Sequence, residues 1–355
     1  MSAHEEILFE HRGGVLIVTL NRPRALNALS RGMCEALSAG LEVWRTDDSV
    51  HAVLVKGAGE RAFCAGGDIR SICDVLAAKG AAEAAAFYAT EYQMNTRLHR
   101  FTKPYVALLD GITMGGGVGV SIHGSHRVAT ERTLLAMPET GIGFFPDVGA
   151  TYVLPRLRGA LGLYLGLTGA RMQAADCLYA GLATHFVAAA RLTELEAALA
   201  ETDLAADAHA QVDAVLGRFV SEPPPTELPK LQPLIDACFD QPSLEAVLEA
   251  LAREPSGWGR AQLEQLQGKS PTSLAVTFQQ LRTGATLGFE AAMQLEYRLV
   301  HRFMAGHDFR EGVRALLVDK DNSPRWRPSH LQDIIGSDLE VYFADLPHGD
   351  LQLNG

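Results

Sequence analysis

Short apolar runs alternate with amphipathic stretches in the N-terminal part of the chain. Three runs rich in β-branched and other apolar residues predict buried strands: Val15–Leu20, Ala52–Lys56 and Pro104–Leu109. Ser30 is placed to cap an amphipathic helix that extends to about Trp44, and the Ala-rich segment 81–100 also predicts a helix. Strands that alternate with helices in this way indicate a mostly parallel α/β core.

The pattern changes after Leu157, where helical periodicity dominates. The Pro-rich stretch 221–225 is the best candidate for a linker. Beyond it, Ser270-Pro271 predicts a capped helix start, and Asp308 with Glu311 forms a capping-box pattern. We therefore predict two domains: an α/β core over residues 1–220 and an all-helical C-terminal subdomain over 221–355.

Composition limits the kinds of partner. The chain has 355 residues, of which 47% are hydrophobic, and a formal charge of −11. This charge argues against nucleic acid or an anionic membrane as a partner. An anionic ligand needs a local basic patch, and five basic residues lie beside the motifs described below: Arg22, Arg24, Arg61, Arg70 and Lys103.

The cysteines predict a reducing compartment. Five are present, an odd number without a CxxC pair, so we expect free thiols. The chain lacks an apolar run of about 18 residues, and its acidic first residues lack signal or transit features. We therefore expect a cytoplasmic location without a membrane span. Cys64, which lies within a glycine-rich loop, is interpreted as a small core residue rather than a nucleophile.

Two glycine-rich stretches and two acids carry the candidate chemistry. The stretches are Phe63–Ile69 and Gly111–Gly117. Because glycine has no Cβ, such turns can aim two backbone N–H groups at one carbonyl oxygen and stabilise an oxyanion. Glu139 and Asp147 stand eight residues apart around a Gly/Pro turn, so they can flank the same carbonyl. The 12 histidines show no metal-binding spacing, and no Gly-x-Ser-x-Gly motif occurs.

These motifs occur in an ordered set with Asn21–Leu29 and Asp308–Ala315. The set resembles the crotonase (enoyl-CoA hydratase/isomerase) superfamily, and most closely its 3-hydroxyisobutyryl-CoA hydrolase branch. The resemblance runs from about Val15 to Arg327. It implies an α/β fold with a crotonase (ClpP-like) ββα spiral core, and a C-terminal helical subdomain that covers the active site.

The resemblance also implies roles for single residues. The N–H groups of Gly67 and Gly116 match the oxyanion donors, and Glu139 matches the catalytic glutamate of hydratases and isomerases. Asp147 is expected to orient a substrate hydroxyl and to help manage protons. Glu91 matches a third acid that binds substrate in the hydrolase branch. Asp68, directly after Gly67, is expected to stabilise the turn.

Coenzyme A contacts are implied as well. Ala65, Gly67 and Arg70 lie where relatives contact the adenine and phosphates, and Arg24 is a further phosphate candidate. Coenzyme A is here part of the substrate, so no separate cofactor and no metal is expected. The acyl-CoA substrate is the expected partner, and a homo-oligomer stays open because superfamily cores often form trimers.

One departure separates hydrolysis from hydration. Hydratases carry a second glutamate where this chain has Gly119, and they commonly carry glycine where it has Asp147. The resemblance therefore implies hydrolysis of a short 3-hydroxyacyl-CoA, first 3-hydroxyisobutyryl-CoA in valine breakdown and then 3-hydroxypropionyl-CoA. The alternatives are an enoyl-CoA hydratase or isomerase and a non-catalytic acyl-CoA-binding protein. Water activation by Glu139 and attack by Glu139 to form an anhydride both stay open.

Overall fold

The computed structural model of the chain describes residues 3–334 and 336–353. Residues 1–2 and 354–355, the outer ends of the two predicted domains, therefore lie outside the described residues, as does part of the acidic N-terminal segment.

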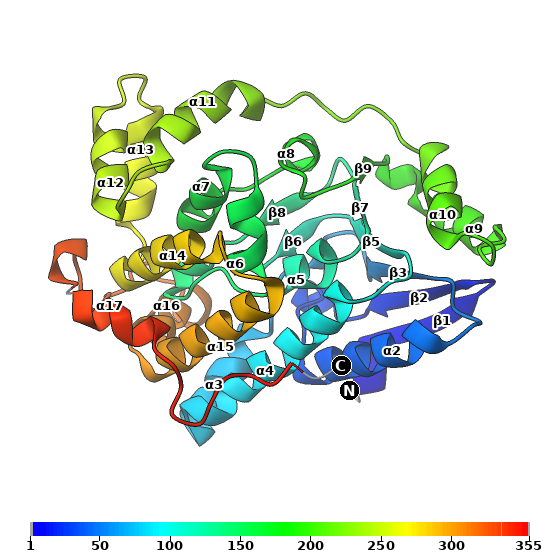
Figure 1. Cartoon of the computed structure of the whole chain (residues 1–355), viewed down its shortest axis with the longest axis horizontal. Helices are drawn as coiled ribbons and strands as arrows, with labels where there is room; N and C mark the ends of the chain where they lie inside the picture. The colour runs from blue at the N-terminus through cyan, green and yellow to red at the C-terminus, as the bar shows by residue number, and fades with distance from the viewer. Residues whose placement is uncertain (1–2, 335, 354–355) are drawn as a thin grey trace.

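The larger sheet has six strands in the order β1-β2-β3-β5-β7-β9 (Figure 1). Their bounds are β1 (Ile7–Arg12), β2 (Val15–Leu20), β3 (Ala52–Gly57), β5 (Tyr105–Leu109), β7 (His126–Ala129) and β9 (His185–Phe186). Only the β1–β2 pair of this sheet is antiparallel, and the other neighbours run parallel. The three predicted strands are confirmed to within one residue at each end.

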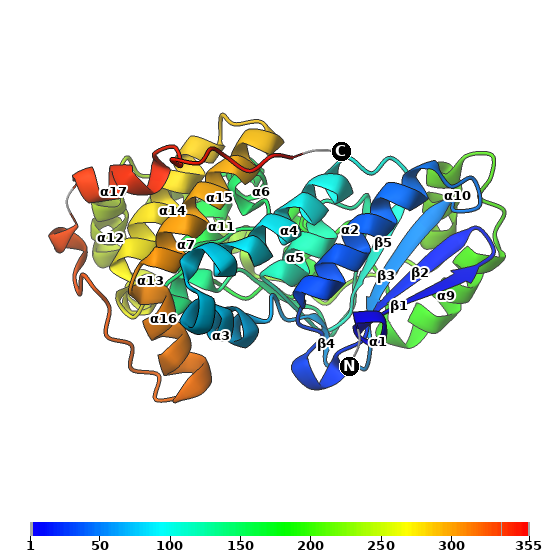
Figure 2. The same ribbon diagram turned by 90° about the horizontal axis from the view of Figure 1, so that it is seen from below.

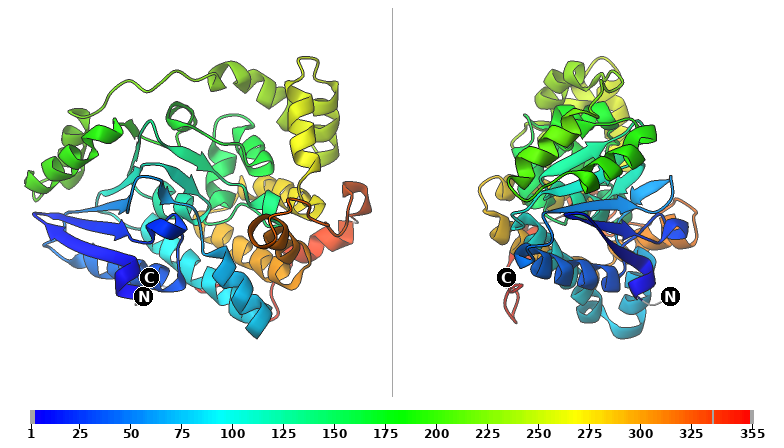
Figure 3. Two further views of the ribbon diagram at one scale, coloured as in Figure 1. Left: turned by 180° about the vertical axis from the view of Figure 1, so that it is seen from behind. Right: turned by 90° about the vertical axis from the view of Figure 1, so that its right-hand side faces the viewer.

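Both faces of this sheet are buried along its inner strands, such as β2. Leu16 and Val18 of β2 pack into the core shared with α2 (Arg31–Thr46) and α4 (Ala81–His99), whereas Val15 and Ile17 face the opposite way. Helices α9 (Leu192–Glu201) and α10 (Ala208–Gly217) cover that second face (Figure 3). A parallel strand buried on both faces reads as a continuous apolar run, which explains why β2 shows no polar alternation.

The smaller sheet positions the glycine loops. Its strands β4 (Ala62–Cys64), β6 (Ile112–Met114) and β8 (Leu134–Ala136) pair in parallel. Parallel strands end at the same edge of a sheet. The residues after β4, which include Gly67, and those after β6, which include Gly116, are therefore brought side by side.

Helices fill the space around both sheets. Those that precede α9, apart from α2 and α4, are α1 (Ala3–Glu6), α3 (Ile69–Lys79), α5 (Gly116–Ile122), α6 (Ala150–Val153), α7 (Leu161–Thr168) and α8 (Ala174–Ala180), with the 3₁₀ turns η1 (Pro23–Ala25), η2 (Glu139–Ile142), η3 (Leu154–Arg156) and η4 (Ala189–Arg191). Ser30 Oγ accepts a 3.2 Å hydrogen bond from Met33 N, which confirms Ser30 as the N-cap of α2. The predicted helix over 81–100 is α4.

Beyond residue 220, the regular elements of the described chain are all helices or helical turns. They are α11 (Leu228–Phe239), α12 (Leu244–Arg253), α13 (Trp258–Gln267), α14 (Pro271–Gly284), α15 (Phe289–Ala305), α16 (Asp308–Val313) and α17 (Gly336–Phe343), with the π-helical turn η5 (Arg314–Val318) and the 3₁₀ turn η6 (Leu331–Asp333). Residues 221–226 have no regular structure and cross from α10 to α11 (Figure 1). Helices α14 to α17 gather at the end of the molecule that holds α3 and α4 (Figure 2). The exact domain boundary stays a prediction.

Two details differ from the sequence patterns. The two-residue strand β9 lies in the segment where helical periodicity dominates, and two residues are too few to produce a strand pattern. The predicted Asp308–Glu311 capping box is wrong, because α16 has no side-chain cap. Asp308 instead accepts hydrogen bonds from Ser270 Oγ (2.6 Å) and Arg327 N (2.8 Å), so tertiary partners replace the local ones.

Candidate active site

The two glycine loops meet at their backbone amides. A Cβ built on Gly116 would stand only 3.2 Å from the nitrogen of Gly67. Leu29 holds the first loop, since its N–H donates to Gly66 O (2.8 Å) and its carbonyl accepts from Asp68 N (2.9 Å). Neither the Gly67 nor the Gly116 N–H donates to an acceptor among the described residues. Two neighbouring free donors, one of them at the start of α5, can serve an oxyanion.

Two acids press against the second loop. Glu91 Oε1 stands 2.5 Å from the point where a Cβ on Gly116 would be, and Glu139 Oε1 stands 2.9 Å from that point on Gly115. Any larger residue at either position would displace a carboxyl group. The glycines are therefore required by the acids as well as by the turn, and the acids lie beside the predicted oxyanion donors.

Most residues of the predicted site line one cavity of about 90 Å³. Its walls include Ala65, Gly67, Glu91, Gly116, Glu139 and Asp147. Apolar side chains close the rest of it, among them Ile69, Ile72, Phe87, Ile142 and Phe144. The three acids are almost fully buried, with exposed fractions of 2% for Glu91, 6% for Glu139 and 4% for Asp147. Helices α14 and α16 of the C-terminal region both contact η2, the turn that begins with Glu139.

The two arginines predicted to contact phosphates, Arg24 and Arg70, do not line this cavity. Arg24 is exposed on η1, and Arg70 is exposed on α3 with its Nη2 donating to Leu317 O (2.7 Å). Their roles toward coenzyme A stay predictions. Lys103 instead donates to the three carbonyls of Trp44, Asp47 and Val50, each at 2.7 Å, so it stabilises the end of α2.

Asp68 and Arg22 have structural partners. Asp68 Oδ1 accepts from Ser71 N (3.2 Å) and caps α3, which confirms its expected role in the turn. Its other oxygen accepts from Arg22 Nη2 (2.7 Å), so the Arg22 charge is already paired beside the first glycine loop.

Burial changes the acidity of the cluster. Burial, and then the charge of Asp147, raise the pKa of Glu139 well above its usual range. Burial raises the pKa of Asp147 to about 7, and the hydrogen bond from Tyr92 acts in the opposite direction. Burial and the charge of Asp147 also raise the pKa of Glu91. Acids with raised pKa values in one cavity are typical of acid–base chemistry.

A cation stands near Glu139. Lys269 Nζ lies 3.6 Å from the points where a Cβ would stand on Gly141 and on Gly169. Burial lowers the pKa of Lys269 to about 8, and the charge of Glu139 opposes this shift. The attraction between the two charges favours the ionised form of Glu139, the form that can act as a base or a nucleophile.

The sequence patterns missed several side chains of the cluster. They include Tyr88, Tyr92 and Asn95 of α4, which are buried like Glu91 of the same helix. Counted from Tyr88, these four residues follow the i, i+3, i+4, i+7 spacing of one helix face, which was a usable signal once Glu91 had been identified. Glu296 of α15 is also buried, and the charge of Asp147 adds to the raised pKa of Glu296. No local pattern distinguishes Glu296 from other glutamates.

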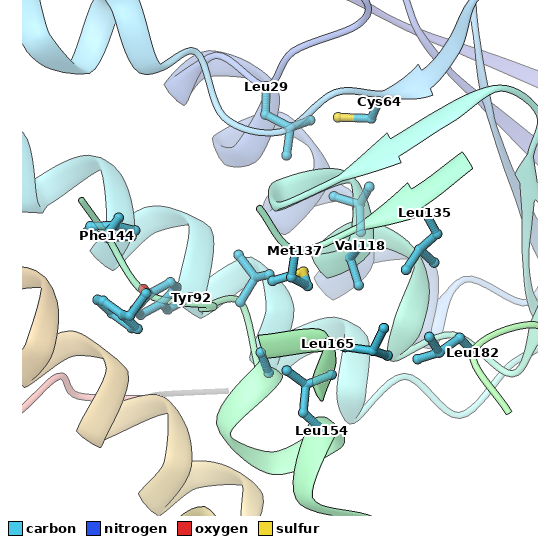
Figure 4. Close-up of a cluster of buried hydrophobic side chains, with 14 of the residues drawn as sticks. Leu29, Cys64, Tyr92, Val118, Leu135, Met137, Phe144, Leu154, Leu165 and Leu182 are labelled. Carbon is cyan, nitrogen blue, oxygen red and sulfur yellow. The ribbon is translucent and has the colours of Figure 1, made fainter. Parts of the chain in front are cut away.

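Position 119 has no room for a second glutamate. A Cβ on Gly119 would stand 2.7 Å from Val148 Cβ and 2.9 Å from Asn95 Nδ2. Asp147 and Val148 also line a second, mostly apolar cavity of about 20 Å³. Its apolar walls include residues that are labelled in Figure 4: Val118, Leu135, Met137, Leu154, Leu165 and Leu182. Cys64 lies at the edge of the same view, is fully buried, and has a pKa raised by burial to about 12, so it is confirmed as a core residue.

Comparison with known proteins shows the family of the chain. The model of the enoyl-CoA hydratase/isomerase family matches residues 15–343. The chain belongs to this family. Among its relatives is the "3-hydroxyisobutyryl-CoA hydrolase, mitochondrial" of Danio rerio, which is 45% identical over 99% of this chain and 92% of that one. The Homo sapiens protein of the same name is 43% identical over 99% and 91%.

Solved structures of the family have the same fold. A carnitinyl-CoA dehydratase from Mycobacterium thermoresistibile is 41% identical, with a TM-score of 0.91 over 99% of both chains. An enoyl-CoA hydratase from Rhodobacter sphaeroides 2.4.1 is 37% identical, with a TM-score of 0.89 over 98% of this chain and 99% of that one. The predicted α/β crotonase core with a helical C-terminal region is therefore confirmed, as is the resemblance to the hydrolase branch.

Proposed function

We propose that the chain hydrolyses short 3-hydroxyacyl-CoA thioesters, with 3-hydroxyisobutyryl-CoA as the first substrate. One observation carries the proposal: Glu139 and Asp147 line one cavity with the two free amides, while position 119 has no room for a second glutamate. The names of the curated relatives support it. No cofactor is needed beyond the coenzyme A of the substrate.

The oxyanion is the first element of the mechanism. The thioester carbonyl oxygen accepts hydrogen bonds from the N–H groups of Gly67 and Gly116 as it gains negative charge. Removal of one such donor typically lowers kcat by about 10²–10³. Because both amides lack other acceptors among the described residues, no existing hydrogen bond has to break when the substrate binds.

Glu139 then supplies the nucleophile by one of two routes. It takes a proton from a water that adds to the carbonyl carbon, or its own carboxylate adds there and forms an anhydride. In both routes the C–S bond breaks and the coenzyme A sulfur leaves and is protonated to the thiol. In the second route water then cleaves the anhydride, which restores Glu139 and releases the 3-hydroxy acid.

Asp147 and Glu91 hold the 3-hydroxyl group of the substrate. Asp147 Oδ2 already accepts from Tyr92, and Glu91 Oε1 has no partner among the described residues although it is buried. A buried acceptor without a partner is unfavourable until a ligand donates to it. A hydroxyl on the third acyl carbon is such a donor, which explains a preference for 3-hydroxyacyl groups.

Hydration of an enoyl-CoA is the second candidate, because solved relatives carry hydratase and dehydratase names. Hydration requires a proton donor and a base on either side of a double bond, and the missing carboxyl at position 119 argues against it. A non-catalytic acyl-CoA-binding protein is the third, and the acid cluster argues against that, because buried acids without partners destabilise a fold that does not use them.

The test measures thiol release from 3-hydroxyisobutyryl-CoA beside hydration of crotonyl-CoA. We expect fast thiol release, little hydration, and a loss of about 10²–10⁴ in rate for Glu139→Gln with binding of the thioester retained. Glu245→Gln, at an exposed site on α12, is the control. Hydration without thiol release would overturn the hydrolase proposal in favour of the second candidate, and neither activity would favour the third.

Labelled water separates the two routes. In a single turnover with H₂¹⁸O, the anhydride route places ¹⁸O in the Glu139 carboxyl group when water attacks the enzyme side of the anhydride. Mass spectrometry of the peptide that contains Glu139 measures this. A labelled peptide would establish the anhydride route, whereas an unlabelled peptide with ¹⁸O in the released acid would exclude an anhydride cleaved at its enzyme side and count against that route.

A role in valine breakdown and a cytoplasmic location complete the proposal. The free cysteines are compatible with a reducing compartment. The curated relatives are named as mitochondrial proteins, so the mitochondrion is the competing location. Among the described residues, no helix is both long and apolar enough to span a membrane. Cell fractionation with an antibody against the chain decides between the two compartments.

A further inference from the structure

The loop that carries Asp147 is bound by two buried side chains of the C-terminal helices. Gln280 of α14 donates from Nε2 to Pro146 O and to Thr151 Oγ1, each at 2.7 Å. Glu296 of α15 accepts from Gly149 N at Oε2 and from Thr151 N at Oε1, each at 2.9 Å. Both side chains are fully buried. Of these four hydrogen bonds, the one to Pro146 lies before Asp147 in the chain and the other three lie after it.

This loop has an unfavourable backbone conformation. Val148 has a φ of +54°, which a β-branched residue adopts rarely. Such a conformation is strained and persists only when surrounding contacts determine it. His123 supplies one more contact, since its Nε2 lies 2.8 Å from Val148 O. Strain directly after Asp147 means that its position depends on the groups that hold the loop.

Asp147 itself has one side-chain partner among the described residues, the Tyr92 hydroxyl on Oδ2. One hydrogen bond to one oxygen fixes a carboxyl group poorly, because the group can still rotate and move with its backbone. The backbone on both sides must therefore be fixed by other groups. Gln280 and Glu296 provide this with four hydrogen bonds.

We propose that Gln280 and Glu296 are positioning residues that fix the orientation of Asp147 toward the 3-hydroxyl group of the substrate. The inference deepens the proposed function and rests on it. The proposal gives the C-terminal helices a direct part in substrate selection. Gln280 and Glu296 lie 129 to 147 residues away in the chain from the loop residues that they bind, yet they fix the geometry of Asp147.

The chemistry of each side chain suits its partners. The Gln280 amide donates to a carbonyl, which a carboxylate cannot do, and Glu296 accepts one N–H group at each of its two oxygens, whereas an amide has only one acceptor oxygen. Glu296→Gln and Gln280→Met therefore remove hydrogen bonds with little change in side-chain volume. Gln279→Met and Glu290→Gln, on exposed positions of the same two helices, are the matched controls.

The experiment compares two substrates of the full-length protein, 3-hydroxyisobutyryl-CoA and isobutyryl-CoA, which lacks the hydroxyl. We expect Glu296→Gln and Gln280→Met to lower kcat/KM for the hydroxylated ester by about 10- to 100-fold, because a misplacement of 1 Å has effects of this size. The value for isobutyryl-CoA should change much less. The controls should stay within about twofold on both esters.

The pH profile is the second readout. Glu296 belongs to the same buried cluster as Asp147, Glu91 and Glu139, and burial together with the charge of Asp147 raises the pKa of Glu296 to about 8. The charge of Glu296 adds to the raised pKa of Glu139 and of Glu91, and replacement by glutamine removes this contribution. In Glu296→Gln the acid limb of kcat/KM should therefore move to lower pH, which a role in stability alone would not cause.

Amide hydrogen exchange tests the hydrogen bonds from Gly149 and Thr151 to Glu296 independently of catalysis. In the wild type the amides of Gly149 and Thr151 should exchange slowly, and in Glu296→Gln at least one of them should exchange faster. Unchanged exchange, or equal losses on both esters with an unmoved acid limb, would overturn the positioning role. If the wild type cleaves neither ester while exchange is still faster in Glu296→Gln, the contacts are confirmed and the proposed function is rejected.

Discussion

The Tyr92 hydroxyl donates a 2.8 Å hydrogen bond to Asp147 Oδ2, although the two residues stand 55 positions apart in the chain. This contact joins α4 to the loop before α6, which carries Asp147. Glu91, the neighbour of Tyr92, faces the second glycine loop from the same helix. Helix α4 therefore brings both Glu91, the acid proposed to bind the substrate hydroxyl, and the partner of Asp147 to the cavity.

Removal of this hydroxyl should change the pH dependence of the reaction. The hydrogen bond from Tyr92 lowers the pKa of Asp147 against the effect of burial, so Tyr92→Phe should raise that pKa above about 7. We expect the acid limb of kcat/KM to move to higher pH, and kcat/KM to fall about 10-fold, since hydrogen bonds to charged groups contribute roughly 1.5–3 kcal/mol. Tyr179→Phe, on the half-buried surface of α8, is the control. An unmoved limb would contradict the role of Tyr92.

Alanine at position 116 should disrupt the oxyanion site. The new Cβ would stand 2.5 Å from Glu91 Oε1 and 3.1 Å from Leu29 Cδ1, so the carboxyl group or the loop must move. We expect Gly116→Ala to lower kcat on the order of 10²-fold, as loss of an oxyanion donor does. Steady-state kinetics on the thioester measure this, with the folded state checked by circular dichroism. Activity within twofold of the wild type would show that the loop adapts freely.

Alanine at position 119 should destabilise the fold. Its Cβ would meet Val148 Cβ at 2.7 Å and Asn95 Nδ2 at 2.9 Å, and overpacking of this kind typically costs about 1–3 kcal/mol. Gly217→Ala is the matched control, because it lies in α10 with nothing within 4 Å of the new Cβ. There we expect a gain of roughly 0.5–1 kcal/mol from helix propensity. Urea unfolding of both variants measures the free energies, and equal effects at the two positions would contradict the packing at Gly119.

The raised pKa of Asp147 should appear in the stability of the protein. Above about pH 4 the unfolded chain has lost a proton that folded Asp147 keeps until about pH 7, so ionisation opposes folding across this window. Asp147→Asn lacks this titration. The free energy of unfolding of the wild type minus that of the variant should therefore fall on the order of 1.4 kcal/mol per pH unit from about pH 4 to 7 and level off above.

Chemical denaturation at several pH values measures this difference. Taking the difference cancels the titration of the buried histidines, which have lowered pKa values and act in the opposite direction. Asp48→Asn, at an exposed turn, is the control. A difference between wild type and Asp147→Asn that stays constant over the window would show that Asp147 is ionised throughout.

The elements that depend on local patterns could be predicted from the sequence. The apolar run of β2, the Ser30 cap of α2 and the Ala-rich α4 all follow from interactions within a few residues. The glycine loops with Glu139 and Asp147 were also visible, because this chemistry needs particular residue types at short spacings. Glu91 was found only through resemblance, since an acid on a helix carries no local sign of burial.

The amino-acid sequence by itself thus determined the longer strands, the helices with clear local patterns, the two glycine loops and the family to which the chain belongs. Tertiary structure alone decided which distant side chains complete the site. Tyr92, Gln280 and Glu296 hold Asp147 and its loop across long stretches of chain, and Lys269 faces Glu139. The physical reason is that hydrogen bonds and charge interactions in a buried cluster depend on distance in space, which packing of the helices against the core sets and local sequence does not record.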